Sequence, residues 1–196
     1  MTTVQEILRD VGIGLEETSD RASLRSECAR MAASARARGV RTLGMLPASD
    51  DVAVPASAIA LGRALSDGSV KPVGVVDALG NWPCAQALSA RAAPHGTPMV
   101  TSWILAGLAL LTPRAAGPAA GLSALRTAVE EPADGFDHLI FDLTGLDHLG
   151  EHLAAFDLLD AVVLVARSGR TTTRQVSRRL SEIPERSGLG VLLTGL

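Results

Sequence analysis

The stretch AVVLVARSGRTTTRQV, residues 161–176, decides the fold class. Its first six residues are all apolar, which is typical of a strand that is buried on both faces. Gly169 then interrupts the apolar run, and the residues from Thr171 to Ile183 have the composition of a helix. A strand buried on both faces needs helices on both sides of its sheet. The stretch therefore predicts an α/β domain with a mainly parallel sheet.

The same order of strand and helix recurs along the chain. Apolar runs predict further strands at residues 41–46, 70–77, 108–111, 138–143 and 191–193, and helices at 21–38, 57–65, 122–131 and 149–159. Thr3 and Glu6 have the spacing of a capping box before an amphipathic helix, which is expected either to pack on its own domain or to dock onto a partner. We therefore expect this helix and a linker over residues 1–20, and one three-layer domain over residues 21–196.

Composition and charge exclude several classes of protein. The 196 residues are 47% hydrophobic and 20% charged, as in ordinary globular domains. A net charge of −3 gives no global basic field, so nucleic acid is not an expected partner. The longest apolar run, from Trp103 to Leu111, is too short to cross a bilayer, so no membrane insertion is expected. Cys28 and Cys84 have no metal-binding spacing, which indicates inert thiols in a reduced, cytoplasmic setting.

Polar residues follow four of the predicted strands. Parallel sheets bind ligands beyond the carboxyl ends of their strands, so these positions hold the candidate site residues. Two of them are carboxylates, Asp77 and Asp142. Such a pair could hold a divalent ion, but each carboxylate could instead cap the turn that follows it, and we favour the capping role.

Three segments resemble P-loop ATPases of the Min and Par type, and most closely the cytoplasmic bacterial tyrosine-kinase domains that accompany polysaccharide polymerisation and export. They are VGVVD (residues 73–77), FDHLIFDLTG (residues 136–145) and DLLDAVVLVARSGRTTTRQV (residues 157–176). The resemblance extends over residues 21–196 and implies a P-loop NTPase-like fold, with Asp77 and Asp142 near the magnesium of Mg-ATP. It also implies self-association through the first helix of the domain. Ring assembly is not expected, because only Arg25, Glu27 and Arg30 match the association motif there.

The loop after the first predicted strand departs from this family. A P-loop presents glycine N–H groups, a lysine and a hydroxyl to the phosphates and magnesium. The corresponding stretch, LPASDDVAVPASAIALGRAL (residues 46–65), has no lysine and only one glycine, near its end. Asp50 and Asp51 bring negative charge to this degenerate loop, and Val54 and Pro55 stand where the family has lysine and a hydroxyl residue.

The chain has a single lysine, Lys71, and no tyrosine. Lys71 lies at the amino end of its predicted strand, so it cannot take the place of the P-loop lysine at the carboxyl ends. The family's kinases phosphorylate a tyrosine-rich tail, so a chain without tyrosine cannot be its own substrate. We therefore expect no catalytic residues and no bound cofactor, with weak binding of Mg-ATP as the alternative.

The turn after residues 161–166 is rich in arginine and hydroxyl groups. It predicts either an anion or acidic-partner site or a capped helix with solvated arginines, with the candidates Arg167, Ser168, Arg170, Thr171 and Arg174.

Two histidines and two tryptophans could take part in a functional site, but we expect structural roles for them. His148 and His152 have helical spacing but no evident third ligand, so we expect no metal site. Trp82 and Trp103 are expected to be core or interface anchors.

The leading interpretation is a catalytically inactive ATPase-like or kinase-like module that acts as an interaction or regulatory subunit. The resemblance implies a role in polysaccharide biosynthesis and export or another envelope-associated process. It also implies a protein partner, such as the cytoplasmic part of a membrane polysaccharide-export protein, and formation of a homodimer. Such a module would be cytoplasmic, reaching the inner membrane only through its partner. Two alternatives are a weak Mg-ATP-dependent ATPase or kinase acting on a partner, and a small-molecule or nucleotide receptor.

Overall fold

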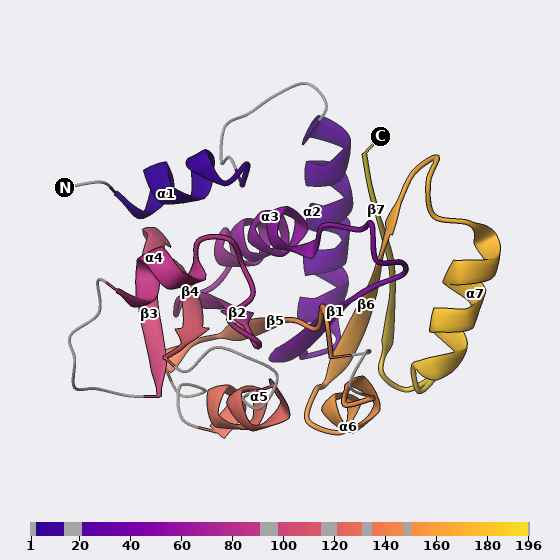
Figure 1. Cartoon of the computed structure of the whole chain (residues 1–196). Helices are drawn as coiled ribbons and strands as arrows, with labels where there is room; N and C mark the ends of the chain where they lie inside the picture. The colour runs from indigo at the N-terminus through magenta and orange to yellow at the C-terminus, as the bar shows by residue number, and fades with distance from the viewer. Residues whose placement is uncertain are drawn as a thin grey trace.

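Seven strands form one sheet in the described part of the chain (Figure 1). The computed structural model describes residues 3–13, 21–90, 98–114, 121–130, 135–146 and 150–195. The strands are β1 (Thr42–Pro47), β2 (Val73–Asp77), β3 (Met99–Leu105), β4 (Leu108–Pro113), β5 (His138–Asp142), β6 (Ala161–Arg167) and β7 (Gly188–Thr194). Their order is β3-β4-β2-β5-β1-β6-β7, and all neighbours are parallel except β3 and β4. The predicted α/β fold with a mainly parallel sheet is confirmed.

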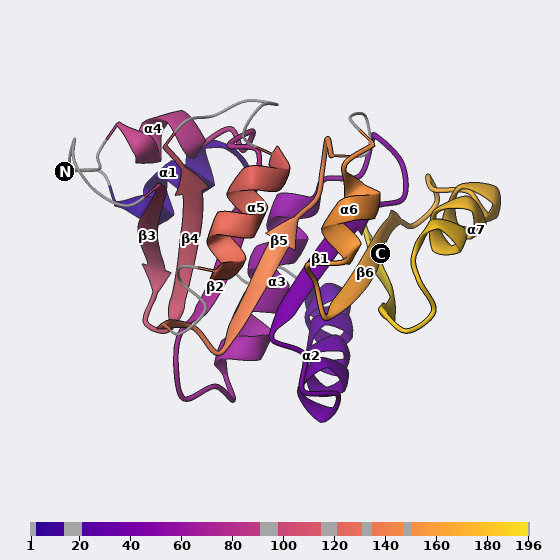
Figure 2. The ribbon, with the colours of Figure 1, turned by 90° about the horizontal axis from the view of Figure 1, so that it is seen from below.

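Helices cover both faces of the sheet, as the apolar strands require. One face carries α1 (Val4–Asp10), α2 (Arg21–Ala37), α3 (Val54–Ser66) and α4 (Ala85–Ser89). The other carries α5 (Gly121–Glu130), α6 (His152–Phe156) and α7 (Thr173–Glu182). Figure 2 shows α5 and α6 in front of the sheet and α2 and α3 behind it. Alternate residues of β2 pack on the two faces. Val75 belongs to the first core cluster, between the sheet and α1–α4, and Val76 belongs to the second, between the sheet and α5–α7.

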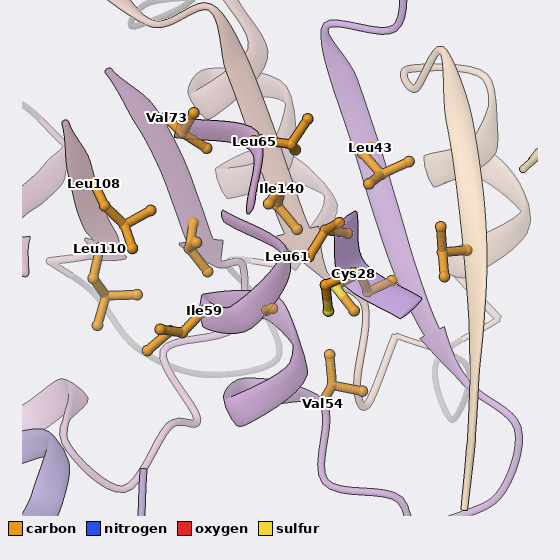
Figure 3. Packing of buried hydrophobic residues seen from close by; sticks show 14 of the residues in the cluster. Cys28, Leu43, Val54, Ile59, Leu61, Leu65, Val73, Leu108, Leu110 and Ile140 are labelled. Carbon is orange, nitrogen blue, oxygen red and sulfur yellow. The ribbon is translucent and has the colours of Figure 1, made fainter. Parts of the chain in front are cut away.

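The central helix α3 packs directly against the strands. Figure 3 shows Ile59 and Leu65 of this helix with Leu108 and Ile140 of the sheet. A methyl group at Gly62 would lie 2.8 Å from Leu108 Cδ1, so glycine allows the helix to come this close. The packing fixes the first turn of α3 at the carboxyl edge of the sheet.

The starts of α3, β2 and β7 differ from the sequence predictions. The helix α3 begins at Val54 rather than at residue 57, because a proline fits the first turn of a helix, where its N–H would have no partner. Val54 and Pro55 therefore belong to the helix and not to the preceding loop. The strand β2 begins three residues late, because Val70 is fully exposed ahead of it. The strand β7 begins at Gly188 instead of residue 191, because its glycine-rich start pairs with β6 through a bulge.

Two elements between residues 78 and 106 are not predicted by the sequence. One is the short helix α4, and the other is the edge strand β3, which pairs antiparallel with β4. A tight turn joins the two strands, and its Gly107 has a φ of +83°, a conformation that favours glycine. The strand pattern of β3 is weak because Thr101 and Trp103 are exposed.

The first helix packs on its own domain. The capping box of Thr3 and Glu6 is confirmed, and Leu8 is fully buried in the first cluster. The Gln5 amide donates a hydrogen bond to the Ile104 carbonyl of β3, at 2.9 Å. None of the helices in the described residues is both long enough and apolar enough to cross a membrane.

Candidate functional site

Two buried carboxylates lie side by side where β2 and β5 end. Asp77 and Asp142 are partners in the parallel register of these strands, and their exposed fractions are 2% and 4%. Asp77 lies two residues after Val75 and Asp142 two residues after Ile140, so each carboxylate is on the same face of the sheet as that apolar residue. The side chains of Val75 and Ile140 pack in the cluster under α3. Both carboxylates are therefore on the α3 face, at the edge where α3 begins.

Each carboxylate accepts hydrogen bonds from the turn that follows its strand. The two oxygens of Asp77 accept from the N–H groups of Asn81, at 3.0 Å, and Trp82, at 2.8 Å. One oxygen of Asp142 accepts from the N–H and hydroxyl of Thr144. These contacts are those of the capping role that the sequence analysis favours.

Trp82 joins the two carboxylates. Its backbone N–H donates to Asp77, and its indole Nε1–H donates to the second oxygen of Asp142 at 2.8 Å. The ring is buried, with 4% of its surface exposed. The prediction that Trp82 is a core anchor is correct, but its hydrogen bond to Asp142 is not foreseen from the sequence.

Burial sets the acidity of this pair. Burial, with a smaller contribution from the charge of Asp142, raises the pKa of Asp77 to about 6 against the opposing effect of the N–H groups of Trp82 and Asn81. Burial also raises the pKa of Asp142, against the hydrogen bonds from Thr144 and Trp82. The site thus disfavours two adjacent negative charges, and the donors around them supply partial compensation.

The oxygens of both carboxylates are already engaged in hydrogen bonds. All four oxygens already accept hydrogen bonds from Asn81, Trp82 and Thr144. A carboxylate oxygen can accept more than one contact, so magnesium would have to share these oxygens with the donors. No group of three or more side chains suited to a metal is found among the described residues.

A small pocket of about 120 Å³ lies beside the pair. Its walls come from the start of α3 and the turns after β2 and β5, and they comprise Val52, Ala53, Val54, Pro55, Asp77, Asn81, Trp82, Pro83, Asp142 and Thr144. Pockets for small molecules usually enclose roughly 300 to 1,000 Å³. This one is below that range, and it lacks a cationic side chain.

The loop between β1 and α3 carries two carboxylates. Asp50 and Asp51 are exposed, and the Asp51 carboxylate accepts a hydrogen bond from the Ser49 hydroxyl at 2.6 Å. That bond lowers the pKa of Asp51, with smaller contributions from the charges of Arg167 and Arg170. The helix start offers few donors, because Ala53 gives no side-chain cap and Pro55 has no N–H.

The turn between β6 and α7 is closed by its own hydroxyl groups. Thr171 Oγ1 accepts from the Arg167 N–H at 2.8 Å, and Thr172 and Gln175 form a capping box at the start of α7. Ser168 is half-buried next to these residues. Arg167, Arg170 and Arg174 are exposed, and none of them lines the pocket at Asp77 and Asp142. The turn meets the β1–α3 loop instead, where Ser49 Oγ lies 3.4 Å from Thr171 Oγ1.

In the described part of the chain, the histidine, cysteine and second tryptophan candidates do not line the pocket at Asp77 and Asp142. His152 is buried between α6 and α7, with Nε2 3.3 Å from a Glu182 carboxylate oxygen, whereas His148 lies outside the described residues. Burial raises the pKa of Cys28 to about 12 and that of Cys84 to about 11, as inert thiols require. Trp103 is 53% exposed, so its assignment to the core is wrong and only the interface role stays a prediction.

The fold is similar to solved bacterial tyrosine-kinase domains and to a ParA-family ATPase. The kinase domain of Escherichia coli tyrosine kinase ETK is 17% identical, with a TM-score of 0.64 over 99% of this chain and 88% of that chain. The BceF tyrosine kinase domain is 17% identical, with a TM-score of 0.60 over 88% of this chain and 76% of that chain. A ParA family ATPase from Chlorobium tepidum TLS is 19% identical, with a TM-score of 0.54 over 78% and 73%.

Sequence comparison gives no family: no family model matches the chain, and no curated protein matches it. The structural likeness at these identities establishes the fold, which is an α/β fold with a mostly parallel seven-stranded sheet flanked by helices, as in P-loop kinase domains. A shared fold does not carry activity with it, since function depends on the residues of the site.

Proposed function

We propose that this chain is a binding or regulatory module on a kinase-like P-loop fold, without nucleotide turnover. The observation that supports this most is the hydrogen bond from the Trp82 indole to Asp142. It occupies, together with the Thr144 donors, the carboxylate that the family resemblance would assign to magnesium. A ligand at Asp142 would therefore compete with these internal hydrogen bonds for the carboxylate.

The composition of the β1–α3 loop supports the same proposal. The stretch from Pro47 to Pro55 has no lysine or arginine, and Asp50 and Asp51 repel phosphate. Stabilisation of transferring phosphate by a single cationic side chain contributes about 10³ to 10⁵ in rate. Turnover is therefore expected to be absent even where weak nucleotide binding persists.

We propose further that the module acts in polysaccharide biosynthesis and export or another envelope-associated process. The family resemblance of the sequence implies this process, and the likeness to bacterial tyrosine-kinase domains supports the fold that goes with it. Its partner would be a protein, such as the cytoplasmic part of a membrane export protein, and a second copy of the chain is a further candidate. The pocket beside Asp142 is small for a nucleotide receptor.

One observation favours a weak Mg-ATP-dependent enzyme as the second candidate. Asp77 and Asp142 end adjacent strands in exact register, so a rotation of Trp82 would leave two carboxylates facing the pocket. The Trp82→Phe variant provides the test, because it removes the indole donor and keeps most of the ring.

Calorimetry with Mg-ATP separates the two candidates. We expect the native chain to show no binding tighter than about 100 µM, which corresponds to about 5.5 kcal/mol. Hydrolysis of ATP that Asp142→Ala abolishes would contradict the proposal. Asp137→Ala is the matched control, since this carboxylate also accepts two backbone N–H bonds but lies at the amino end of β5.

A further inference from the structure

We propose that the outer edge of β7, with the arginines beside it, binds an extended acidic segment of a partner protein as an added strand. The inference rests on the proposed binding role and names the chemistry of the partner. It concerns a surface separate from the pocket at Asp77 and Asp142.

The backbone of β7 has one paired and one open side. β7 is the last strand of the sheet, and among the described strands it pairs only with β6. Thr194 O accepts from Ser168 N at 2.9 Å, so the peptide groups of Thr194 face β6. Peptide groups alternate along a strand, and those of Val191 and Leu193 therefore face away from β6. The side chain of Leu193 is also 41% exposed.

Arginine side chains lie at both ends of this open edge. At its start, the Arg38 guanidinium donates to the carbonyls of Arg186, at 2.9 Å, and Gly188, at 2.8 Å. At its end, the Arg167 side chain lies next to Gly195, where an added methyl group would be 3.5 Å from Arg167 Cγ. The section from Val191 to Thr194 is thus open and is flanked by positive charge.

The exposed side of α7 extends this charge. Arg174 and Arg178 are one helical turn apart, and both are exposed. Within the described residues, neither guanidinium makes a hydrogen bond or an ion pair, unlike the buried Arg179, which pairs with Glu182 at 2.9 Å. Figure 1 shows α7 at the same end of the sheet as β7. Acidic side chains of an added strand would meet these arginines, which is the charge complementarity that selects a partner.

An extended peptide strand fits these features better than a lipid surface does. Open N–H and C=O groups in a row are the recognition element of strand addition, and they give a lipid surface nothing to bind. The opposite edge of the sheet is less accessible, because Gln5 of α1 occupies the Ile104 carbonyl of β3.

The test uses the whole chain and a labelled peptide of alternating valine and glutamate residues, with a valine and lysine peptide as its control. Fluorescence anisotropy should detect binding of the acidic peptide only. Leu193→Pro removes an outward N–H that β6 does not use, so we expect it to weaken binding about tenfold or more. Leu193→Ala keeps this N–H and should change affinity by less than about threefold.

A second variant and a second measurement complete the test. Arg174→Glu with Arg178→Glu should also weaken binding about tenfold and reduce its dependence on salt. If Leu193→Pro fails to fold, hydrogen exchange on the native chain should show the amides of Val191 and Leu193 protected by the acidic peptide.

Four results would overturn the inference. The first three are equal binding of the two peptides, binding that Leu193→Pro leaves unchanged, and binding to phosphatidylcholine and phosphatidylglycerol vesicles that needs the arginines but not the open edge. A dimer that Leu193→Pro dissociates would name a second copy as the occupant and would also overturn it. ATP hydrolysis would contradict the proposed function alone and would leave the peptide result intact.

Discussion

The carboxyl ends of β2 and β5 and the edge formed by β7 use their polar groups in opposite ways. At the first, Asp77 and Asp142 are buried and hydrogen-bonded to Trp82 and Thr144. At the second, arginine side chains and peptide groups face solvent. Parallel sheets usually bind ligands in the first kind of place. Here internal hydrogen bonds already engage the carboxylates at that position, whereas the polar groups beside β7 face outward.

Removal of Trp82 should have the largest effect. Trp82→Ala deletes a buried ring and leaves Asp142 without its indole donor, so the free energy of unfolding should fall by about 3 to 5 kcal/mol. Trp103→Ala is the matched control, and its exposed ring should contribute about 1 kcal/mol or less. Urea denaturation measures both. Equal losses would mean that Trp82 does not close the site.

The pH dependence of stability comes next. The pKa of Asp77 is about 6 in the folded chain and near 3.8 when unfolded, so the folded state binds the proton more tightly. Stability is then highest below pH 4 on account of this group, and about 3 kcal/mol is lost as the pH rises to about 7. Asp77→Asn should remove this pH-dependent loss. The measurement is the free energy of unfolding in urea as a function of pH, compared between the native chain and the variant.

Asp137 should change stability with pH in the opposite direction to Asp77. The N–H of Lys71 lowers its pKa, with help from that of Val70, so its contribution is present at neutral pH and is lost in acid. The variant Asp137→Asn should therefore become relatively less stable at neutral pH. A profile for Asp77→Asn that parallels that of the native chain would show that burial does not control the titration of Asp77.

A smaller effect is expected at Thr144. Thr144→Val removes the hydroxyl donor to Asp142 and keeps the shape, at a cost of about 0.5 to 1.5 kcal/mol. Its loss should also raise the pKa of Asp142 further, since the hydroxyl bond favours the charged form. Thr101→Val, at an exposed position of β3, is the control and should be neutral.

The smallest effect should come from the open region. Arg174→Ala combined with Arg178→Ala removes two solvated charges, so stability should change by less than about 0.5 kcal/mol. Thermal unfolding at low and high salt measures this. A loss above about 1 kcal/mol would show that these arginines stabilise the fold and are not held available for a partner.

The sequence predicts the central part of the sheet well, because apolar runs covered on both faces have an unambiguous pattern. The strands from Val73 to Asp77 and from Ala161 to Arg167 are examples. It fails at the edge strand β3, where Thr101 and Trp103 interrupt the apolar pattern and Gly107 forms the turn to β4. Edge strands are half solvated, so periodicity describes them poorly.

The candidate site is predictable only in part. The positions of Asp77 and Asp142 follow from strand order, because adjacent parallel strands end at one edge of the sheet. The contact of Trp82 with Asp142 spans 60 residues and depends on the turn after β2, whose path no local pattern specifies. The sequence prediction starts α3 too late, because a proline such as Pro55 is equally typical of a loop and of the first turn of a helix.

The amide of Gln5 on the Ile104 carbonyl has a consequence for the size of any complex. A sheet with two receptive borders can add copies without limit and grow into a fibre. In this sheet the Gln5 amide of α1 takes one carbonyl of the β3 border, whereas the β7 border pairs with no further strand among the described residues. With β7 as the receiving strand, growth stops after one addition, so assembly is self-limiting and each chain recruits a single segment.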